Sequence, residues 1–317
     1  MHPPLNSRRV VVSARNEIGL EAFTLPPLEA DQVLVQTHTS AISPGTELAF
    51  IQHKPTTPGQ YPLYPGYSAC GRVVERGEAV TQLDVGQLVA LNIPHSSHAV
   101  LAAEACHPVD DRLSPAEVAP FRLVSIALQG IHRADIRLGS SVAITGLGPI
   151  GLLAGQLARA AGAGYVEGID PLDWRRHLAL ACGLDAATPA AAVSDRVGTF
   201  EVVIEASGHP EVIPAAFQLA GPRGRVVLLG SPRGPTAEVD FYSDVHKKGL
   251  TVIGAHEIHR LHSDFEDEET ALALMAARRI DVKPLISQVV AAEEAASAYE
   301  RLAKREEHLM LLALDWS

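Results

Sequence analysis

The stretch Ser141-Val142-Ala143-Ile144-Thr145-Gly146-Leu147-Gly148-Pro149-Ile150-Gly151 decides how the chain folds. Its apolar, β-prone residues 142–145 predict a buried strand, and the Ala- and Leu-rich run from Ile150 predicts a helix. The Gly-x-Gly-x-x-Gly pattern lies between them. Gly146 permits the tight turn out of the strand, Gly148 leaves room for a pyrophosphate, and Gly151 lets helix and strand pack closely. We therefore expect a dinucleotide with its pyrophosphate at the helix N-terminus.

A second β-prone run, residues 165–169, ends at Asp170, about twenty residues beyond the last glycine. A carboxylate there accepts hydrogen bonds from a ribose 2′-hydroxyl and repels a 2′-phosphate, which favours NAD over NADP. Arg175 and Arg176 follow closely, and an arginine is able to bind a 2′-phosphate, so NADP is the second candidate. The alternative without a nucleotide is an ordinary strand–turn–helix with an exposed Asp.

Composition limits the possible classes of protein. A length of 317 residues suggests about two domains. A hydrophobic content of 47% with 20% charged residues is typical of a soluble globular protein. The net charge of −11 argues against nucleic acid or an anionic membrane as partner. We expect a cytoplasmic protein, because there is no apolar leader, no run of membrane-spanning length and no disulfide pattern among three widely spaced cysteines.

Two patterns divide the chain. The first 120 or so residues hold short β-branched runs between Pro- and Gly-containing turns, and the proline-dense stretch 44–65 predicts an irregular loop. Ser114 before Pro115 predicts the start of a helix that runs to about residue 134. Strand-like runs then alternate with helical segments, which predicts a parallel sheet; the runs are 142–145, 166–169, 201–205, 225–230 and 251–254. Two further helices, 266–279 and 292–304, precede a closing apolar run at 310–314.

Five motifs then occur in a recognisable order. They are Pro65-Gly66-Tyr67-Ser68-Ala69-Cys70-Gly71-Arg72-Val73-Val74, Val85-Gly86-Gln87-Leu88-Val89, the glycine motif, Glu205-Ala206-Ser207-Gly208 and Pro284-Leu285-Ile286-Ser287. With them the whole chain resembles the medium-chain dehydrogenase/reductase superfamily. The resemblance implies an α/β protein with a GroES-like β-rich catalytic domain, residues 1–121 and 260–317. It also implies a Rossmann domain with a doubly wound parallel sheet, residues 122–259, and a homodimer formed through that domain.

The glycine motif and the resemblance together indicate a set of cofactor-binding residues. They are Gly146, Leu147, Gly148, Pro149, Ile150, Gly151, Asp170, Arg175, Ser207, Gly208, Gly230, Ser231 and His256. His256 is included by analogy, which puts it near the nicotinamide. Its other interpretation is a polar residue at the end of a strand.

The chain departs from the zinc-dependent members of this superfamily. They carry a Cys in the loop that is here Ile42-Ser43-Pro44-Gly45-Thr46-Glu47, and Gly-His-Glu in place of Gly66-Tyr67-Ser68. Their structural zinc lobe has four close cysteines, whereas only Cys106 lies in that region. Because zinc needs several ligands that converge on one point, we predict no zinc at the family's positions. The pattern His95-x-x-His98 with Cys106-His107 matches no familiar metal site and is better explained as scattered loop residues.

The Ser-Pro-Gly-Thr-Glu loop, the Gly-Tyr-Ser sequence, the short length and the ending Ala313-Leu314-Asp315-Trp316 resemble one branch of the superfamily. That branch includes the bacteriochlorophyllide a dehydrogenases. The resemblance implies the class of reaction and the cofactor, but nothing in the sequence identifies a tetrapyrrole as substrate.

Without a metal, a side chain must handle the hydroxyl proton of the substrate. The candidates are Tyr67, Thr46, His98 and Ser43. Tyr67 replaces the zinc-binding His, and a phenol with a pKa near ~10 is a usable acid, although a packed aromatic is an equal alternative. Thr46 matches a relay hydroxyl of zinc-dependent relatives, or is a turn hydroxyl. His98 titrates near neutrality, but a surface-loop histidine is the simpler interpretation.

Glu47 matches a family acid whose role is mainly structural, and Ser43 belongs to the same loop. The sequence thus predicts an NAD-dependent, zinc-independent oxidoreductase that interconverts a secondary alcohol and a ketone of small size by hydride transfer. Two alternatives stay open. One is an NAD(P)H-dependent enone or quinone reductase, and the other is a nucleotide-binding protein that has lost catalysis.

Overall fold

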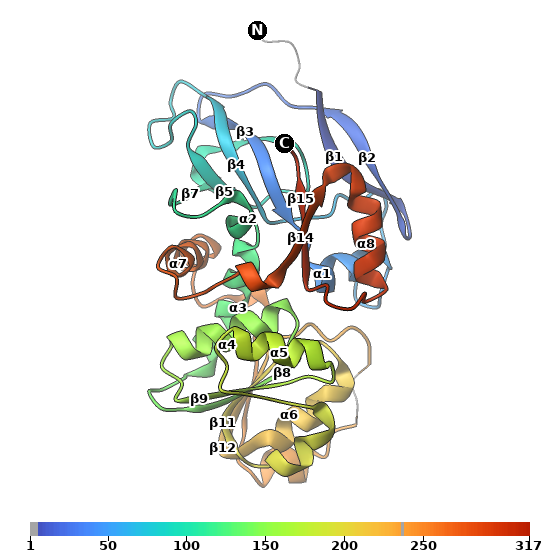
Figure 1. The fold of residues 1–317 in the computed structure, drawn as a ribbon, viewed down its shortest axis with the longest axis vertical. Helices are drawn as coiled ribbons and strands as arrows, with labels where there is room; N and C mark the ends of the chain where they lie inside the picture. Colours follow the sequence, from blue (N-terminus) through green and yellow to red (C-terminus); the bar gives the residue numbers. More distant parts are fainter. Residues whose placement is uncertain (1–5, 236–237) are drawn as a thin grey trace. The chain divides into compact units, whose positions relative to one another are not determined.

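The computed structural model describes residues 6–235 and 238–317, and its contacts divide the chain into two compact units (Figure 1). Unit 1 comprises the described residues through Arg122, with Glu268–Ala276 and Leu285–Ser317. Unit 2 comprises Leu123–Asp267 and Ala277–Pro284. The first boundary between the units falls after residue 122, where the sequence analysis expected it after residue 121. The chain returns to unit 1 at residue 268, where residue 260 was expected, and residues 277–284 of this C-terminal part belong to unit 2.

Unit 2 is built on a six-stranded parallel sheet in the order β10-β9-β8-β11-β12-β13. The strands are β8 (Ser141–Thr145), β9 (Tyr165–Ile169), β10 (Ala186–Thr188), β11 (Phe200–Glu205), β12 (Ala220–Leu228) and β13 (Thr251–Gly254). This is the strand order of a dinucleotide-binding Rossmann sheet, with β8 and β11 at the point where the order reverses. The fold expected for this part of the chain is confirmed.

Helices lie along this sheet, as Figure 1 shows for α4, α5 and α6. Their bounds are α4 (Pro149–Ala160), α5 (Asp173–Ala181) and α6 (Ile213–Leu219), and short helical turns are η2 (Ala190–Arg196), η3 (Pro210–Val212), η4 (Phe241–His246) and η5 (Glu257–His259). The centres of β8 and β11 are buried, and their residues 142–144 and 202–204 form continuous apolar runs, as expected for central strands of a parallel sheet. Two further helices, α3 (Phe121–Ala134) and α7 (Asp264–Ala276), each span a division between the units.

Unit 1 is β-rich, as expected. Its seven-stranded sheet runs β14-β15-β3-β4-β5-β7, with β6 paired to β3, and a separate hairpin joins β1 and β2. The strands are β1 (Asn6–Ala14), β2 (Glu17–Thr24), β3 (Gln32–Ala41), β4 (Ala69–Arg76), β5 (Leu88–Leu91), β6 (His98–Ala102), β7 (Cys106–Pro108), β14 (Ile286–Ala291) and β15 (Leu311–Asp315). Its helices are α1 (Pro44–Ile51), α2 (Pro115–Val118), α8 (Ala295–Ala303), η1 (Ala103–Ala105) and η7 (Ala292–Glu294), and η6 (Lys283–Leu285) begins in unit 2.

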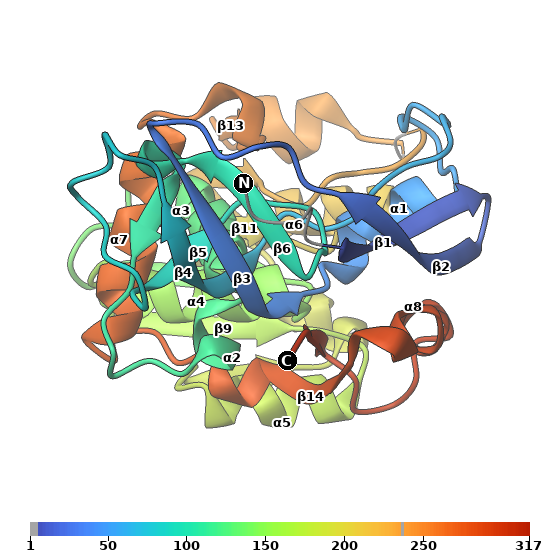
Figure 2. The ribbon, with the colours of Figure 1, turned by 90° about the horizontal axis from the view of Figure 1, so that it is seen from above.

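The C-terminal segment completes the core of unit 1. β15 pairs antiparallel with β3, and Leu312, Leu314 and Trp316 join the cluster that contains Val10 and Val12 of β1. Figure 2 shows α8 beside the β1–β2 hairpin, in agreement with their contacts. Residues more than 300 positions apart in the chain, such as Val10 and Leu312, therefore share one hydrophobic cluster.

Two local expectations were wrong. The proline-dense stretch contains the helix α1, because Pro44 occupies its first turn, where the missing N–H costs nothing. The helix expected from Ser114 to Ala134 is two helices. Ser114 and Glu117 form a capping box at the start of α2, and α2 ends before Pro120, which cannot continue it. Among the described residues, no helix has the length and apolarity needed to cross a membrane.

Candidate nucleotide site and candidate catalytic residues

The glycine turn after β8 has the geometry that a pyrophosphate site needs. Gly146 has a φ of +85°, and a Cβ there would lie 2.6 Å from Ser207 Cα. A Cβ on Gly151 would lie 1.9 Å from the carbonyl oxygen of Gly146. Both positions therefore require glycine for reasons internal to the fold.

Gly148 differs from Gly146 and Gly151, because no atom of the described residues, its two chain neighbours aside, lies within 4 Å of the place where its Cβ would be. It is the N-cap residue of α4, and Pro149 occupies the first turn. The space left by the missing side chain lies at a helix N-terminus with backbone N–H groups and a favourable dipole, where an anion is stabilised. This open cradle fits the pyrophosphate of a dinucleotide.

The ends of β11 and β12 bring further predicted residues to the same cradle. Ser207 packs against Gly146, and a Cβ on Gly230 would lie 2.4 Å from the backbone nitrogen of Gly208. A Cβ on Gly208 would lie 3.1 Å from the backbone carbonyl oxygen of Ser231. The predicted residues Gly146–Gly151, Ser207, Gly208, Gly230 and Ser231 are therefore gathered around the carboxyl ends of adjacent parallel strands.

Asp170 lies at the end of β9 and is only 2% exposed. Its Oδ2 accepts a hydrogen bond from the Leu147 N–H (2.8 Å), and its Oδ1 accepts one from the Leu172 N–H (2.9 Å). Each carboxylate oxygen keeps a second lone pair, and the side chain is almost fully buried in this structure. The structure thus gives Asp170 a structural task, which is to tie the glycine loop to the end of β9.

Arg175 lies beside this carboxylate, with its Nη1 atom 3.7 Å from Asp170 Oδ2. Its guanidinium group also lies over the ring of Trp174, 5.2 Å from the ring centroid. An acidic and a basic group therefore meet at the end of β9, where the sequence analysis expects the 2′ substituent of the cofactor, and the pair keeps both NAD and NADP as candidates.

His256 has a local role in the structure. It follows β13, is exposed, and its Nδ1 accepts a hydrogen bond from the Ile258 N–H at the start of η5. This is the strand-end interpretation that the sequence left open beside a cofactor role.

Glu205 is a buried acid that the sequence reasoning did not count among the site residues. It is 0% exposed, and its Oε1 accepts from the N–H and the hydroxyl of Ser207. Oε2 has no hydrogen-bond partner among the described residues. Burial raises the pKa of Glu205, and the bonds from Ser207 offset part of that rise. The signal available in the sequence was an acidic residue at the end of an apolar run that predicts a strand.

In unit 1, Glu47 is the centre of a buried polar cluster that we call the Glu47 cluster; its other members are Ser40, His95, Tyr299 and Trp316. Glu47 Oε1 accepts from the Ser43 N–H (2.7 Å), and Oε2 lies 3.0 Å from His95 Nε2. The Tyr299 hydroxyl also donates to Oε2. Glu47 is 3% exposed and His95 is 0% exposed, so water contributes little.

Tyr67 lies close enough to this cluster to act on it electrostatically. The pKa of Tyr299 is raised well above its usual value. Burial is the largest cause, followed by the charge and the hydrogen bond of Glu47 and then by the charge of Tyr67. Thr46 is half-buried in the first turn of α1, next to Glu47. Ser43 is the buried N-cap residue of that helix, and its backbone N–H, not its hydroxyl, holds Glu47.

The other histidines of this region lie in different environments. His98 starts β6, and its Nδ1 is 3.1 Å from the hydroxyl of Ser97. Burial lowers the pKa of His98, which makes the neutral imidazole its ordinary form near neutral pH. His107 pairs with Glu268. His95 is therefore the histidine that joins the Glu47 cluster, and the His95-x-x-His98 pattern does not act as a pair.

The donor atoms of unit 1 do not fit a zinc ion. Within residues 6–235 and 238–317, there is no group of three His, Cys, Asp or Glu side chains that could hold a metal. Glu47 and His95 bond each other, and Ser68 is occupied by Ala119 and Arg122. Cys70 and Cys106 are buried thiols, and burial raises the pKa of Cys106 to about 12. A zinc site needs deprotonated or nitrogen ligands that converge, and these residues do not supply them.

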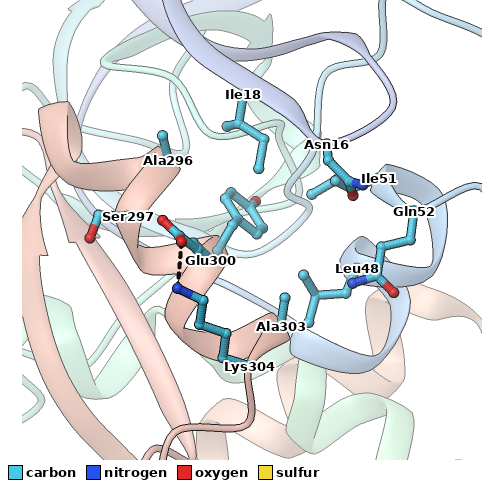
Figure 3. Close-up of a pocket in the computed structure, with 11 residues that line it drawn as sticks. Asn16, Ile18, Leu48, Ile51, Gln52, Ala296, Ser297, Glu300, Ala303 and Lys304 are labelled. Carbon is cyan, nitrogen blue, oxygen red and sulfur yellow. Dashed lines mark hydrogen bonds and ion pairs between the residues drawn. The ribbon is translucent and has the colours of Figure 1, made fainter.

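A cavity of about 500 Å³ lies beside this cluster in unit 1 (Figure 3). Leu48 and Ile51 of α1, Ala303 of α8 and Ile18 of the hairpin make its wall mainly apolar, and the Glu300–Lys304 ion pair lies at its edge. Tyr299 also lines this cavity, and its hydroxyl bonds Glu47. The ring of Tyr299 therefore separates the cavity from the buried carboxylate.

Two family models match the chain in the order that the fold suggests. The alcohol dehydrogenase GroES-like domain matches residues 29–117, and the zinc-binding dehydrogenase model matches residues 149–277. The chain is 26% identical to L-threonine 3-dehydrogenase of Bacillus velezensis, over 93% of this chain and 96% of the relative. It is 25% identical to sorbitol dehydrogenase of Gallus gallus, over 96% of both chains.

Solved structures support the same fold. A Sinorhizobium meliloti 1021 protein of the zinc-binding dehydrogenase type, crystallised with NADP, superimposes with a TM-score of 0.86 at 25% identity, over 98% of this chain and 99% of that one. L-idonate 5-dehydrogenase of Escherichia coli superimposes with a TM-score of 0.87 at 20% identity, over 99% of both chains. With two matching models, full-length relatives and this geometry, the chain belongs to the medium-chain, alcohol dehydrogenase-like superfamily and is an oxidoreductase of that type.

Proposed function

We propose that the protein interconverts a secondary alcohol and a ketone with a pyridine nucleotide, prefers NAD to NADP, and needs no zinc at the family's ligand positions. One contrast carries the proposal. Unit 2 offers an open glycine cradle at Gly148, while in unit 1 the groups near Tyr67 bond one another instead of offering ligands to a metal. The relatives named sorbitol dehydrogenase and L-threonine 3-dehydrogenase support a substrate with a hydroxyl-bearing carbon.

The bound nicotinamide would supply or accept the hydride. The chain's own residues would do the rest. Backbone N–H groups at the start of α4 bind the pyrophosphate, and Asp170 accepts from the adenosine ribose. Tyr67 donates its phenolic proton as the ketone oxygen becomes an alkoxide, and takes it back in the oxidative direction. Thr46 relays that proton, because its hydroxyl both donates and accepts.

The test is reduction of NAD on addition of alcohols, followed by the absorbance of the reduced nicotinamide. A panel of polyols, hydroxy acids and simple secondary alcohols is run with NAD and with NADP. Activity that survives removal of metals by a chelator, together with loss of activity in Tyr67→Phe at unchanged NADH affinity, is the expected result. Activity that depends on added zinc contradicts the zinc-independent part.

A second candidate is an NAD(P)H-dependent enone or quinone reductase. The donor set around Glu47 favours it, because a conjugated substrate is activated by its own structure and needs only a hydride and a proton. Oxidation of NADH by enones and quinones, without any alcohol oxidation, would select this candidate. NADH binding without turnover of any alcohol, ketone, enone or quinone would select a binding protein that has lost catalysis.

Three finer features belong to the same proposal. A homodimer through unit 2 is supported by β13, which is the edge strand of its sheet and carries the half-exposed Val252. Light scattering on the full chain tests the dimer.

The resemblance to the bacteriochlorophyllide a dehydrogenases supports adding a tetrapyrrole with a hydroxyethyl group to the panel. A cytoplasmic location stays part of the proposal, and fractionation of the cells of origin tests it.

A further inference from the structure

The hydrogen bonds of the Glu47 cluster have a direction that follows from one donor. The indole N–H of Trp316 can only donate, and it lies 2.9 Å from the Ser40 hydroxyl oxygen. Ser40 Oγ is therefore an acceptor in this pair. The other hydrogen-bond contact of this hydroxyl among the described residues is His95 Nδ1, at 2.8 Å, so that nitrogen is the acceptor available to the Ser40 hydrogen.

This assignment favours one tautomer of His95. If Ser40 donates to Nδ1, that nitrogen carries no hydrogen, and the ring proton is on Nε2. Nε2 lies 3.0 Å from Glu47 Oε2 and donates to it. A doubly protonated His95 would leave the Ser40 hydrogen without an acceptor among the described contacts.

Three donors converge on the carboxylate of Glu47. Glu47 accepts from the Ser43 N–H on Oε1 and from His95 and Tyr299 on Oε2. An ionised carboxylate is acceptor-only and suits three donors, whereas a protonated one would need an acceptor of its own. Charge-assisted bonds of this kind are stronger than bonds between neutral groups.

The same cluster is packed against the two segments that carry the proton-handling candidates. The Ser43 N–H is the start of α1, the helix that carries Thr46 in its first turn. Gly66, the neighbour of Tyr67, has a φ of +100°, and a Cβ there would lie 2.5 Å from the backbone nitrogen of His95. That nitrogen donates to the Pro65 carbonyl at 2.8 Å.

We propose that Glu47, His95 and Tyr299 are positioning residues. Glu47 is ionised, His95 is neutral with its proton on Nε2, and together with Tyr299 they hold Thr46 and Tyr67 in place. The inference rests on the proposed function for its catalytic meaning, because it concerns the residues that handle the proton there. Its structural content, a fixed tautomer and a fixed pair of segments, can be measured whether or not a substrate is known.

The first experiment is a nitrogen-15 NMR measurement of the histidine side chains in the full chain, with His95→Gln used to assign the His95 signals. We expect Nε2 protonated and Nδ1 bare at neutral pH. A doubly protonated ring, or a proton on Nδ1, would overturn the assignment.

The second experiment compares Tyr299→Phe with Tyr61→Phe. Tyr61 is a matched control, because it packs on the same hydrophobic cluster and its hydroxyl donates to the Ile51 carbonyl at 3.1 Å. We expect amide hydrogen exchange in residues 43–47 and 65–68 to rise roughly tenfold in Tyr299→Phe, since one charge-assisted bond is lost, and to stay unchanged in Tyr61→Phe. Equal exchange in the two variants would overturn the positioning role.

Activity gives a separate result. With any substrate that turns over, Tyr299→Phe should lower kcat roughly tenfold, shift its pH profile and leave the affinity for NADH unchanged. Unchanged kcat alongside faster exchange would overturn the catalytic meaning. Absence of turnover in the unaltered protein would reject the proposed function, while the tautomer and exchange results would still decide the structural part.

Discussion

The two regions that matter most in this molecule are built in opposite ways. The nucleotide cradle of unit 2 consists of backbone, because Gly146, Gly148 and Gly151 act through the side chains they lack. The Glu47 cluster of unit 1 consists of side chains from β3, α1, the loop before β6, α8 and the C-terminus. The comparison teaches that a site made by a local turn is visible in a short stretch of sequence, whereas a site made by distant side chains is not.

The largest expected effect lies in the side-chain site. Glu47→Ala leaves the Ser43 N–H, His95 and Tyr299 without their acceptor, so the free energy of unfolding should fall by roughly 3–5 kcal/mol. Denaturant unfolding measures it. Glu21→Ala, whose partner Arg9 is partly exposed, is the control and should cost about 1 kcal/mol or less. Equal losses would show that the cluster is not a core element.

The glycine cradle, which is built from backbone, should lose NADH affinity when a side chain is added to one of its glycines. Gly148→Ala meets open space, so we expect unchanged thermal stability and NADH binding weakened about tenfold or more. Gly151→Ala meets the Gly146 carbonyl at 1.9 Å and should lose stability as well as binding. NADH fluorescence titration and thermal unfolding separate the two. If Gly148→Ala binds NADH as the unaltered protein does, the cradle does not hold a pyrophosphate.

Asp170 and Arg175 test the choice of cofactor at the edge of that cradle. Asp170→Ala should raise the apparent Michaelis constant for NAD by roughly tenfold and narrow the gap to NADP, because it removes the ribose acceptor. It also removes the acceptor of the Leu147 N–H, so Asp170→Asn is the milder comparison. Arg175→Ala should weaken only NADP. A preference for NADP in the unaltered protein would show that the assignment to NAD is wrong.

The smallest expected effect is a pH dependence at Glu205. Because its pKa is raised by burial in the folded state, its contribution favours folding at low pH and is lost as the pH rises above 4.5, through the folded pKa. Glu205→Gln should flatten this part of the curve. Thermal unfolding from acid to neutral pH measures the difference between the two proteins, which should grow with pH. Parallel curves would mean that Glu205 has an ordinary pKa.

Much of unit 2 could be predicted from sequence. The run 165–169 is β9, the run 251–254 is β13, and the glycine spacing located the turn and the start of α4. These features depend on neighbours in the chain, because periodicity and glycine conformation act over a few residues. The helix α1 was missed, since a cluster of prolines suggested a loop although Pro44 at the first turn is compatible with a helix.

The sequence by itself thus determined the Rossmann unit, the open glycine cradle and the departure from zinc ligands. Only the tertiary structure decided that His95, not His98, joins Glu47, and that Tyr299 and Trp316 complete the cluster. The physical reason is separation along the chain. Pairing of β15 with β3 brings Trp316 to Ser40, and no short-range pattern encodes a contact across 276 residues.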